Sequence, residues 1–222
     1  MPTKIPKRIA STVLNSLKGG VVPRVGLPYV AVGREAEIDA LLHDVDIIAD
    51  GGATFRFIVG KYGSGKSFLL QTIRNYAMDR NFVVVDADLS PERRLQGSHG
   101  QGLATYKELI RNMSTKTRPE GGALTLILDR WISGVQQDVL AEGLEPGTEA
   151  FAQRVEMRIH EVVGTLSELV HGFDFAQLLV MYYRAYVNDD EDAKAKVIKW
   201  FRGEYANKTE ARNELGIRII IS

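Results

Sequence analysis

The feature that most constrains the fold of this chain is a glycine-rich stretch at residues 60–67. Its sequence, GKYGSGKS, fits the pattern G-x-x-x-x-G-K-[ST]. A short apolar run at residues 55–59 precedes it, and apolar residues at helical spacing follow from Ser67 to Met78. The order of buried strand, glycine loop and helix is the context in which this pattern forms a phosphate-binding loop, the Walker A motif.

Each fixed position of the motif has a chemical reason. Glycines accept positive φ and let backbone N–H groups approach phosphate oxygens. Lys66 can neutralise phosphate charge, and the Ser67 hydroxyl can ligate Mg²⁺, so these two are the expected catalytic residues. We therefore predict binding of ATP and Mg²⁺, with Ser67 as the metal ligand. The expected cofactor-binding residues in and after the loop are Gly60, Lys61, Tyr62, Gly63, Ser64, Gly65, Lys66, Ser67 and Phe68.

A second apolar run, Phe82–Val85, follows the predicted helix. Together with residues 55–59 it completes a strand–loop–helix–strand unit, which is typical of a parallel sheet. Most of the later chain shows apolar residues three and four apart, which predicts helices. We therefore expect an α/β fold, a P-loop NTPase parallel sheet with a large, mostly helical insertion or subdomain.

Composition excludes several classes. Apolar residues make up 45% and charged residues 25% of the 222 residues, as in ordinary globular proteins. The absence of cysteine excludes disulfides, thiolate metal sites and a cysteine nucleophile. No apolar run reaches the roughly 18–20 residues of a membrane span, and no secretory signal is present. We expect a cytoplasmic protein without a membrane partner.

The balanced total of 28 bases and 28 acids hides an uneven distribution. Six bases and no acid precede Glu35, and six acids without a base follow from Glu35 to Asp50. The basic arm of residues 4–24 could contact a DNA backbone, or it could present solvated helix faces and domain contacts.

Hydrolysis of ATP would also need an acid at the end of a second buried strand. Asp86 and Asp88 end the run at 82–85, in the order of a nucleoside-kinase-like P-loop fold. This leaves open a small-molecule kinase that uses Asp86 or Asp88. Asp129 continues a helical spacing of apolar residues, so we interpret it as a helix position. In the ATPase interpretation the chain has a Walker A loop and no convincing Walker B acid.

Two resemblances add to this interpretation. Residues 32–38, VGREAEI, resemble the box that opens many initiator-like ATPases of the AAA+ superfamily. In those proteins the box starts a helix beside the adenine ring, which would add Gly33 and Arg34 to the cofactor-binding residues. The resemblance implies an AAA+/initiator-like order of the sheet.

The chain as a whole resembles the ATP-binding protein family of bacterial BREX phage-defence systems. The strings that carry the resemblance are residues 16–24, 56–67, 88–94, 106–112 and 118–124. It implies an AAA+-type ATPase in anti-phage defence that acts with DNA and other system proteins. Members of that family are longer and carry their Walker B strand beyond the length of this chain, so a truncated chain is expected.

We accordingly expect an ATP-binding module of such an ATPase, with ATP, DNA, other defence proteins and further copies of the chain as partners. The alternatives are the kinase and a non-hydrolysing assembly module that nucleotide switches. The domain organisation that we predict is an N-terminal helix and connector at 1–32, a nucleotide-binding core at 33–98, a mostly helical region at 99–216 and the start of a further strand at 217–222.

Overall fold

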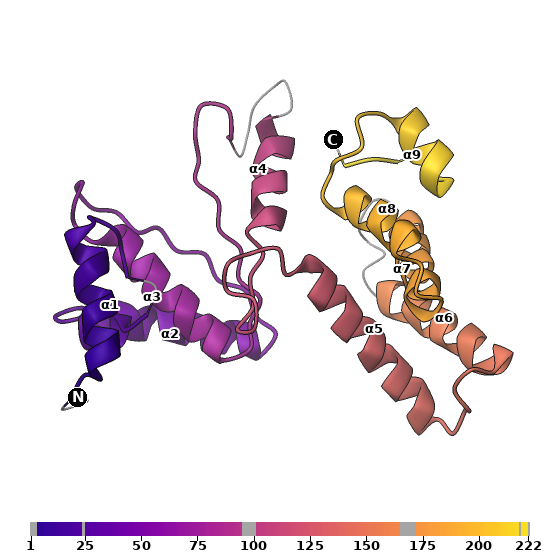
Figure 1. Cartoon of the computed structure of the whole chain (residues 1–222), viewed down its shortest axis with the longest axis horizontal. Coiled ribbons are helices and arrows are strands. Elements are labelled where there is room, and N and C mark those ends of the chain that lie inside the picture. Colours follow the sequence, from indigo (N-terminus) through magenta and orange to yellow (C-terminus); the bar gives the residue numbers. More distant parts are fainter. Residues whose placement is uncertain (1–3, 24, 95–100, 165–171, 218, 222) are drawn as a thin grey trace. The chain divides into compact units, whose positions relative to one another are not determined.

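The computed structural model describes residues 4–23, 25–94, 101–164, 172–217 and 219–221 (Figure 1). The chain divides into two compact units. The first comprises Met1–Val84 with Thr115–Pro119, and the second comprises Val85–Ser114 with Glu120–Ser222.

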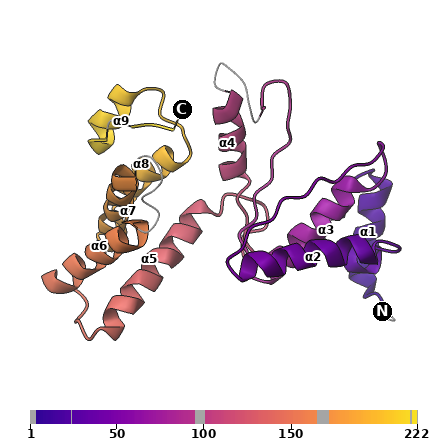
Figure 2. The same ribbon diagram turned by 180° about the vertical axis from the view of Figure 1, so that it is seen from behind.

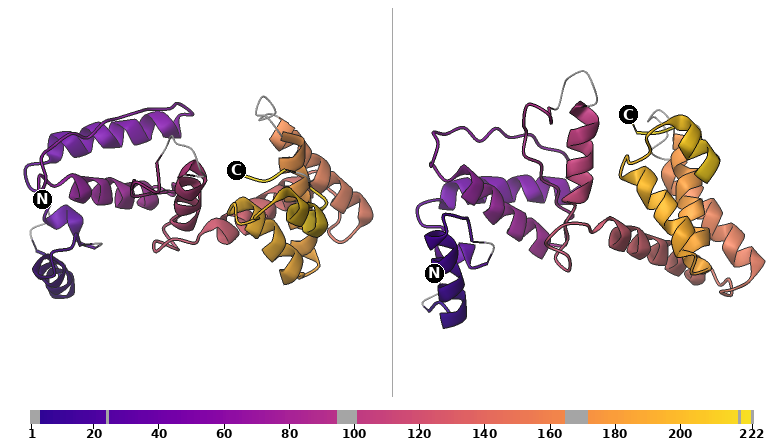
Figure 3. Two further views of the ribbon diagram at one scale, coloured as in Figure 1. Left: turned by 90° about the horizontal axis from the view of Figure 1, so that it is seen from above. Right: turned by 45° about the horizontal axis from the view of Figure 1, so that its top comes forward.

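The first unit contains three α-helices and one short 3-10 helix in its described part. They are α1 (Lys7–Lys18), η1 (Leu27–Tyr29), α2 (Glu35–Ala49) and α3 (Lys66–Asp79). Helices α2 and α3 lie side by side, as both views of Figure 3 show. Gly26, at φ +78°, brings the connector close to α1, because a Cβ there would lie 2.6 Å from Ile9 Cγ2. Glycine at this position thus permits the close approach to Ile9 and Val13 of α1, and the next residue, Leu27, is completely buried.

The second unit contains six helices in its described part. They are α4 (Gln101–Arg111), α5 (Leu124–Ala141), α6 (Glu149–Gly164), α7 (Gly172–Val187), α8 (Glu191–Phe201) and α9 (Lys208–Leu215). Helices α5 to α9 contact one another in chain order, and Figure 2 shows α6 and α7 lying side by side. Such packing of successive helices follows from the short connections between them.

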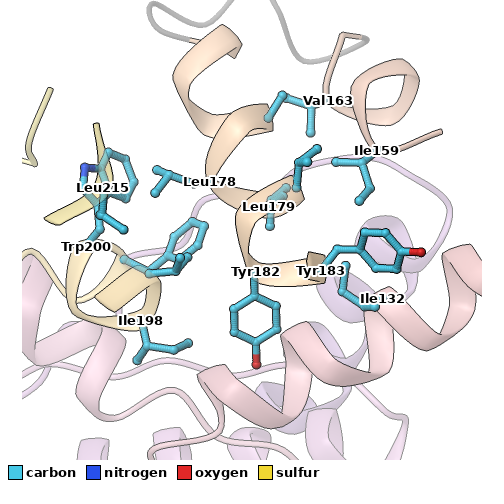
Figure 4. Packing of buried hydrophobic residues seen from close by; sticks show 14 of the residues in the cluster. Ile132, Ile159, Val163, Leu178, Leu179, Tyr182, Tyr183, Ile198, Trp200 and Leu215 are labelled. Atoms are coloured by element: carbon cyan, nitrogen blue, oxygen red, sulfur yellow. The ribbon is translucent and has the colours of Figure 1, made fainter. Parts of the chain in front are cut away.

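The core of the second unit lies between α5, α6, α7 and α8 (Figure 4). Ile132, Ile159 and Leu178 are completely buried there. Tyr182 is buried as well, and its hydroxyl points to α5, where it donates to Asp129 Oδ1 at 2.6 Å. The hydrogen bond satisfies the one polar atom of this side chain, which allows the ring to remain in the core.

The predicted fold class is wrong. In the part of the chain that the structure describes, regular structure is entirely helical, and the extended pairs Ser90–Arg93 and Thr115–Arg118 are isolated bridges. This contradicts the α/β fold, the P-loop NTPase parallel sheet and its AAA+/initiator-like order. Residues 55–59 and 82–85, which we predicted as strands, have no regular structure beyond a single bridge position at Val84.

The physical reason is visible in the exposure of the expected strand. Phe55 is 82% exposed, Phe57 79% and Val59 93%. Aromatic and β-branched residues favour a strand only where a neighbouring strand takes up the backbone hydrogen bonds and covers the side chains. No second strand pairs with residues 55–59 among the described residues. Their preference for extended structure therefore does not lead to a strand.

The helical predictions are confirmed within one or two turns. Apolar periodicity located eight of the nine α-helices of the described residues, and the ninth, Lys208–Leu215, was expected as a short helix. Apolar spacing predicts one helix over 149–170, and residues 165–170 of that range lie outside the described residues. Ile217 and residues 219–221 have no regular secondary structure. None of the described helices is both long and apolar enough to cross a membrane.

Candidate functional site

The glycine loop precedes α3 directly, and its conformation depends on three glycines. Gly63 and Gly65 adopt positive φ values of +77° and +85°. Gly65 is the N-cap residue of α3, so the loop turns into the helix through a left-handed residue. Gly60 is required for a different reason, since a Cβ there would lie 2.5 Å from Ser64 Oγ. The fixed glycines of the motif therefore have specific steric roles in this fold.

Lys66 closes the loop on itself. Its Nζ donates to the carbonyl oxygens of Gly60 and Lys61, at 2.8 Å in both cases. The ammonium group consequently lies beside the start of the loop, although Lys66 itself belongs to the first turn of α3. The first turn of a helix presents N–H groups without partners in its own ladder and a partial positive charge. The ammonium group of Lys66 and the start of α3 together favour the binding of an anion at the glycine loop.

Arg34 joins α2 to the glycine loop. One guanidinium nitrogen, Nη2, donates to the carbonyl oxygen of Ser64, and the other, Nη1, binds Glu37 Oε1 at 2.9 Å. Arg34 is the N-cap residue of α2, so its side chain leaves directly from the helix start. A backbone hydrogen bond and the Arg34 guanidinium lower the pKa of Glu37, which keeps this carboxylate charged and the arginine oriented.

The extended segment before the loop is held by a second arginine. Arg56 Nη2 donates to Asp44 Oδ1 at 2.9 Å, and Arg56 Nε donates to the other oxygen of the same carboxylate. This two-point pairing lowers the pKa of Asp44 and fixes residue 56 against α2. Neither residue was among the predicted site residues. The sequence feature that could have indicated this pair is Arg56, the one charged residue of an apolar run, together with Asp44 in an acidic helix.

The other predicted site residues have different positions. Tyr62 is fully exposed, Ser67 is exposed in the first turn of α3, and Phe68 is partly buried. Gly33 adopts φ +72° next to Arg34, and a Cβ there would meet no atom within 4 Å. The structure therefore brings Arg34 and the loop together, while nothing in it assigns a contact to Gly33. The expectation that the box starts a helix is confirmed, because α2 begins at Glu35.

None of the candidate acids lies at the end of a strand in the described part of the chain. Asp86 and Asp88 belong to the second unit and stand on a segment that forms no strand. Asp129 lies within α5, as its spacing predicted, and accepts the Tyr182 hydroxyl while Lys194 Nζ lies 3.8 Å away. The kinase alternative required Asp86 or Asp88 on a strand beside Ser67, and the described residues provide no such strand.

A glycine loop closed by a lysine at a helix start defines a candidate phosphate-binding protein. A family model described as BREX system ATP-binding protein BrxC/D matches residues 5–222, and the chain belongs to this family. The resemblance inferred from the sequence is thereby confirmed, and it places the chain among ATP-binding proteins of BREX defence. Comparison with curated proteins and with solved structures gave no significant match.

Proposed function

We propose that residues 60–67 form the phosphate-binding part of the ATP site. The observation that carries the proposal is the position of Lys66 Nζ, held by two carbonyl oxygens of the loop whose glycines are sterically required. Lys66 neutralises charge on the β- and γ-phosphates, and amide groups of the loop and of the α3 start donate to phosphate oxygens. Phe68 follows Ser67 in the first turn of α3, next to the proposed phosphate site in the sequence.

Arg34 has a positioning role in this proposal. Its bond to the Ser64 carbonyl fixes the end of the loop next to α3. The resemblance to the AAA+ box supports a further contribution of Gly33 and Arg34 on the nucleoside side of the ligand. Since the guanidinium is already engaged with Ser64 and Glu37, its first effect is on loop geometry.

Mg²⁺ is part of the same proposal. The Ser67 hydroxyl is exposed in the first turn of α3, where it is free to face a phosphate. No group of three or more His, Cys, Asp or Glu residues able to hold a metal occurs among the described residues. This fits Mg²⁺ rather than a protein-caged ion, because Mg²⁺ keeps several waters and takes most other ligands from phosphates. When bound, the ion would supply charge neutralisation between the phosphates.

The finer biological role is also proposed. The resemblance supports an AAA+-type ATPase that works in the cytoplasm with DNA and other BREX proteins. The basic side of α1 supports a DNA contact, because Lys7, Arg8 and Lys18 are exposed on a helix that has no acid. Self-association into a larger assembly belongs to the same interpretation.

Replacement of Lys66 tests the nucleotide site. Lys66→Ala should abolish ATP binding in calorimetric titration while the melting temperature stays near that of the parent. Lys18→Ala is the matched control, since it removes a lysine from an exposed helix position. Unchanged ATP affinity in Lys66→Ala would contradict the proposal.

The non-hydrolysing assembly module is the second candidate. It is favoured by the observation that neither acid-bearing segment stands on a strand in the described part of the chain. Binding and phosphate release, measured separately on the same preparation, distinguish the two. Tight ATP binding without phosphate release supports the module, and rapid turnover by the chain alone supports the ATPase.

A further inference from the structure

A cavity in the second unit has the charge of an anion-binding site. Its volume is about 510 Å³, and it lies between α4, the start of α5 and the residues that follow α8. We call it the α4 pocket. Its lining includes three cations, Lys107 and Arg111 of α4 and Arg202 after α8, and the apolar residues Ile110 and Leu124.

The pocket is fixed by contacts between α4 and the end of α8. The Tyr106 hydroxyl donates to the carbonyl oxygen of Phe201 at 2.5 Å. Burial raises the pKa of Tyr106 to about 12, so the hydroxyl keeps its proton at neutral pH and remains a donor. Gly203 permits the close approach, since a Cβ there would lie 3.0 Å from Leu103 Cδ1. These contacts place Arg202 at the same cavity as the charged face of α4.

The three cations of the pocket have no counterion among the residues that the structure describes. Within the described residues, Lys107, Arg111 and Arg202 take part in no hydrogen bond or ion pair of their side chains. Lys107 and Arg111 stand four residues apart on one face of α4, a spacing at which like charges destabilise a helix. Without a bound anion, the repulsion between these two charges lowers the stability of α4.

The acids of the lining do not offset these cations. Glu108 is already bound by Arg93 Nη1 at 3.0 Å and accepts from the Asn112 side chain at 3.3 Å. Glu204 remains as the acid of the lining without a paired base in the described structure. The pocket thus keeps an excess of positive charge beside its apolar wall.

We propose that the α4 pocket binds a small phosphorylated molecule of about mononucleotide size. Arginine guanidinium groups match phosphate oxygens in two-point hydrogen bonds, and Arg111 and Arg202 supply two of them. Cavities of this volume are typical of small-ligand sites, and Ile110 and Leu124 offer contact to the non-phosphate part of the ligand. The site is separate from Gly60–Ser67, because all of its lining belongs to the second unit.

Calorimetric titration of the full chain carrying Lys66→Ala tests this site without a contribution from the glycine loop. The probes are pyrophosphate, adenosine monophosphate and a short single-stranded oligonucleotide. We expect pyrophosphate and the mononucleotide to bind. Arg111→Gln and Arg202→Gln should each weaken binding about tenfold, which corresponds to the loss of one charge-assisted hydrogen bond. Arg212→Gln, at an exposed position of α9, is the matched control and should change nothing.

A second variant keeps the test valid if an arginine variant does not fold. Glu204→Gln removes the unpaired acid from the lining and should tighten pyrophosphate binding. The proposal is overturned if neither small probe binds the Lys66→Ala chain, if Arg212→Gln weakens binding as much as the pocket variants, or if only the oligonucleotide binds. The last result would assign this surface to nucleic acid.

Discussion

Arg34 at the start of α2 donates to the backbone carbonyl of Ser64, the residue that precedes the final glycine of the loop. Two sequence motifs separated by about one helix and one extended segment thus meet through one hydrogen bond. Because the bond goes to a carbonyl, it acts on the path of the loop backbone. Arg34 therefore couples the position of α2 to the geometry of the candidate phosphate site.

Replacement of Arg34 should weaken ATP binding without removing it. Arg34→Ala leaves the Ser64 carbonyl without this donor, and we expect about tenfold lower affinity, the value of one hydrogen bond from a charged group. Arg34→Lys should lie between the two, since an ammonium group can donate to Ser64 or to Glu37 but lacks the fork that reaches both. Glu37→Gln tests the orienting contact and should weaken binding less than Arg34→Ala, while Asp39→Asn, an exposed position of the same helix, is the control. Equal ATP affinity for parent and Arg34→Ala would refute the coupling.

The steric role of Gly60 predicts a rescue. Gly60→Ala places its methyl carbon 2.5 Å from Ser64 Oγ, so the loop must shift and ATP binding should fall. Combining it with Ser64→Ala removes the clashing hydroxyl and leaves a Cβ–Cβ distance of 3.4 Å, which is close to an ordinary contact. The double variant should regain much of the lost affinity in the same titration. Failure of the rescue would show that the hydroxyl is not the obstacle.

The pairing of Asp44 with Arg56 predicts a dependence of stability on pH. The arginine lowers the pKa of Asp44 below the unfolded value of about 3.9. Its stabilising effect is therefore complete above that value and is lost as the pH falls through the lower, folded pKa. Arg56 is exposed and Asp44 is only partly buried, so the effect is small and screened by salt.

Chemical denaturation at neutral and at acid pH measures this effect. Asp44→Asn should lower the free energy of unfolding near pH 7, and the difference from the parent should shrink as the pH falls below 4. Asp39→Asn on the same helix, with an exposed carboxylate, is the matched control. A difference that stays constant down to the acid range would mean that Arg56 does not act through the charge of Asp44.

Helices could be predicted from this sequence because their signal is local. A helix satisfies its own backbone, and one apolar stripe suffices to bury it, so spacing located α5, α6 and α7 well. Boundaries were less accurate where a polar residue belongs to the helix start. Asp190 lies in the polar stretch 188–192, which predicts a break between helices, but it is the N-cap of α8 and accepts a hydrogen bond from the Ala193 amide at 2.9 Å.

The strands and the contacts of the site could not be predicted in the same way. The run at residues 55–59 has the composition of a strand, but a strand depends on partners far away in sequence. The loop itself was recognisable from its spacing, since glycine, lysine and serine have fixed roles there. The bond from Arg34 to Ser64 links residues thirty positions apart through a backbone carbonyl. Because every residue type has this carbonyl, the identity of residue 64 does not reveal the bond.

A structural role of Asp129, as acceptor of the Tyr182 hydroxyl, can be distinguished by experiment from a catalytic role. Its carboxylate accepts the buried Tyr182 hydroxyl, and burial together with this bond raises the pKa of Tyr182. Asp129→Ala leaves that hydroxyl without its acceptor and should cost about 1–3 kcal/mol of unfolding free energy, and Tyr182→Phe should cost about 1 kcal/mol. Asp138→Ala, at an exposed position of the same helix, should cost far less.

A double-mutant cycle completes this test. The combined variant should be less destabilised than the sum of the two single changes, because each removes the same hydrogen bond. ATP affinity and any phosphate release should remain as in the parent, since Asp129 is engaged by the hydroxyl of Tyr182, a core residue of the second unit. Loss of turnover in Asp129→Ala at unchanged stability would reverse the assignment and make this carboxylate a metal-binding acid.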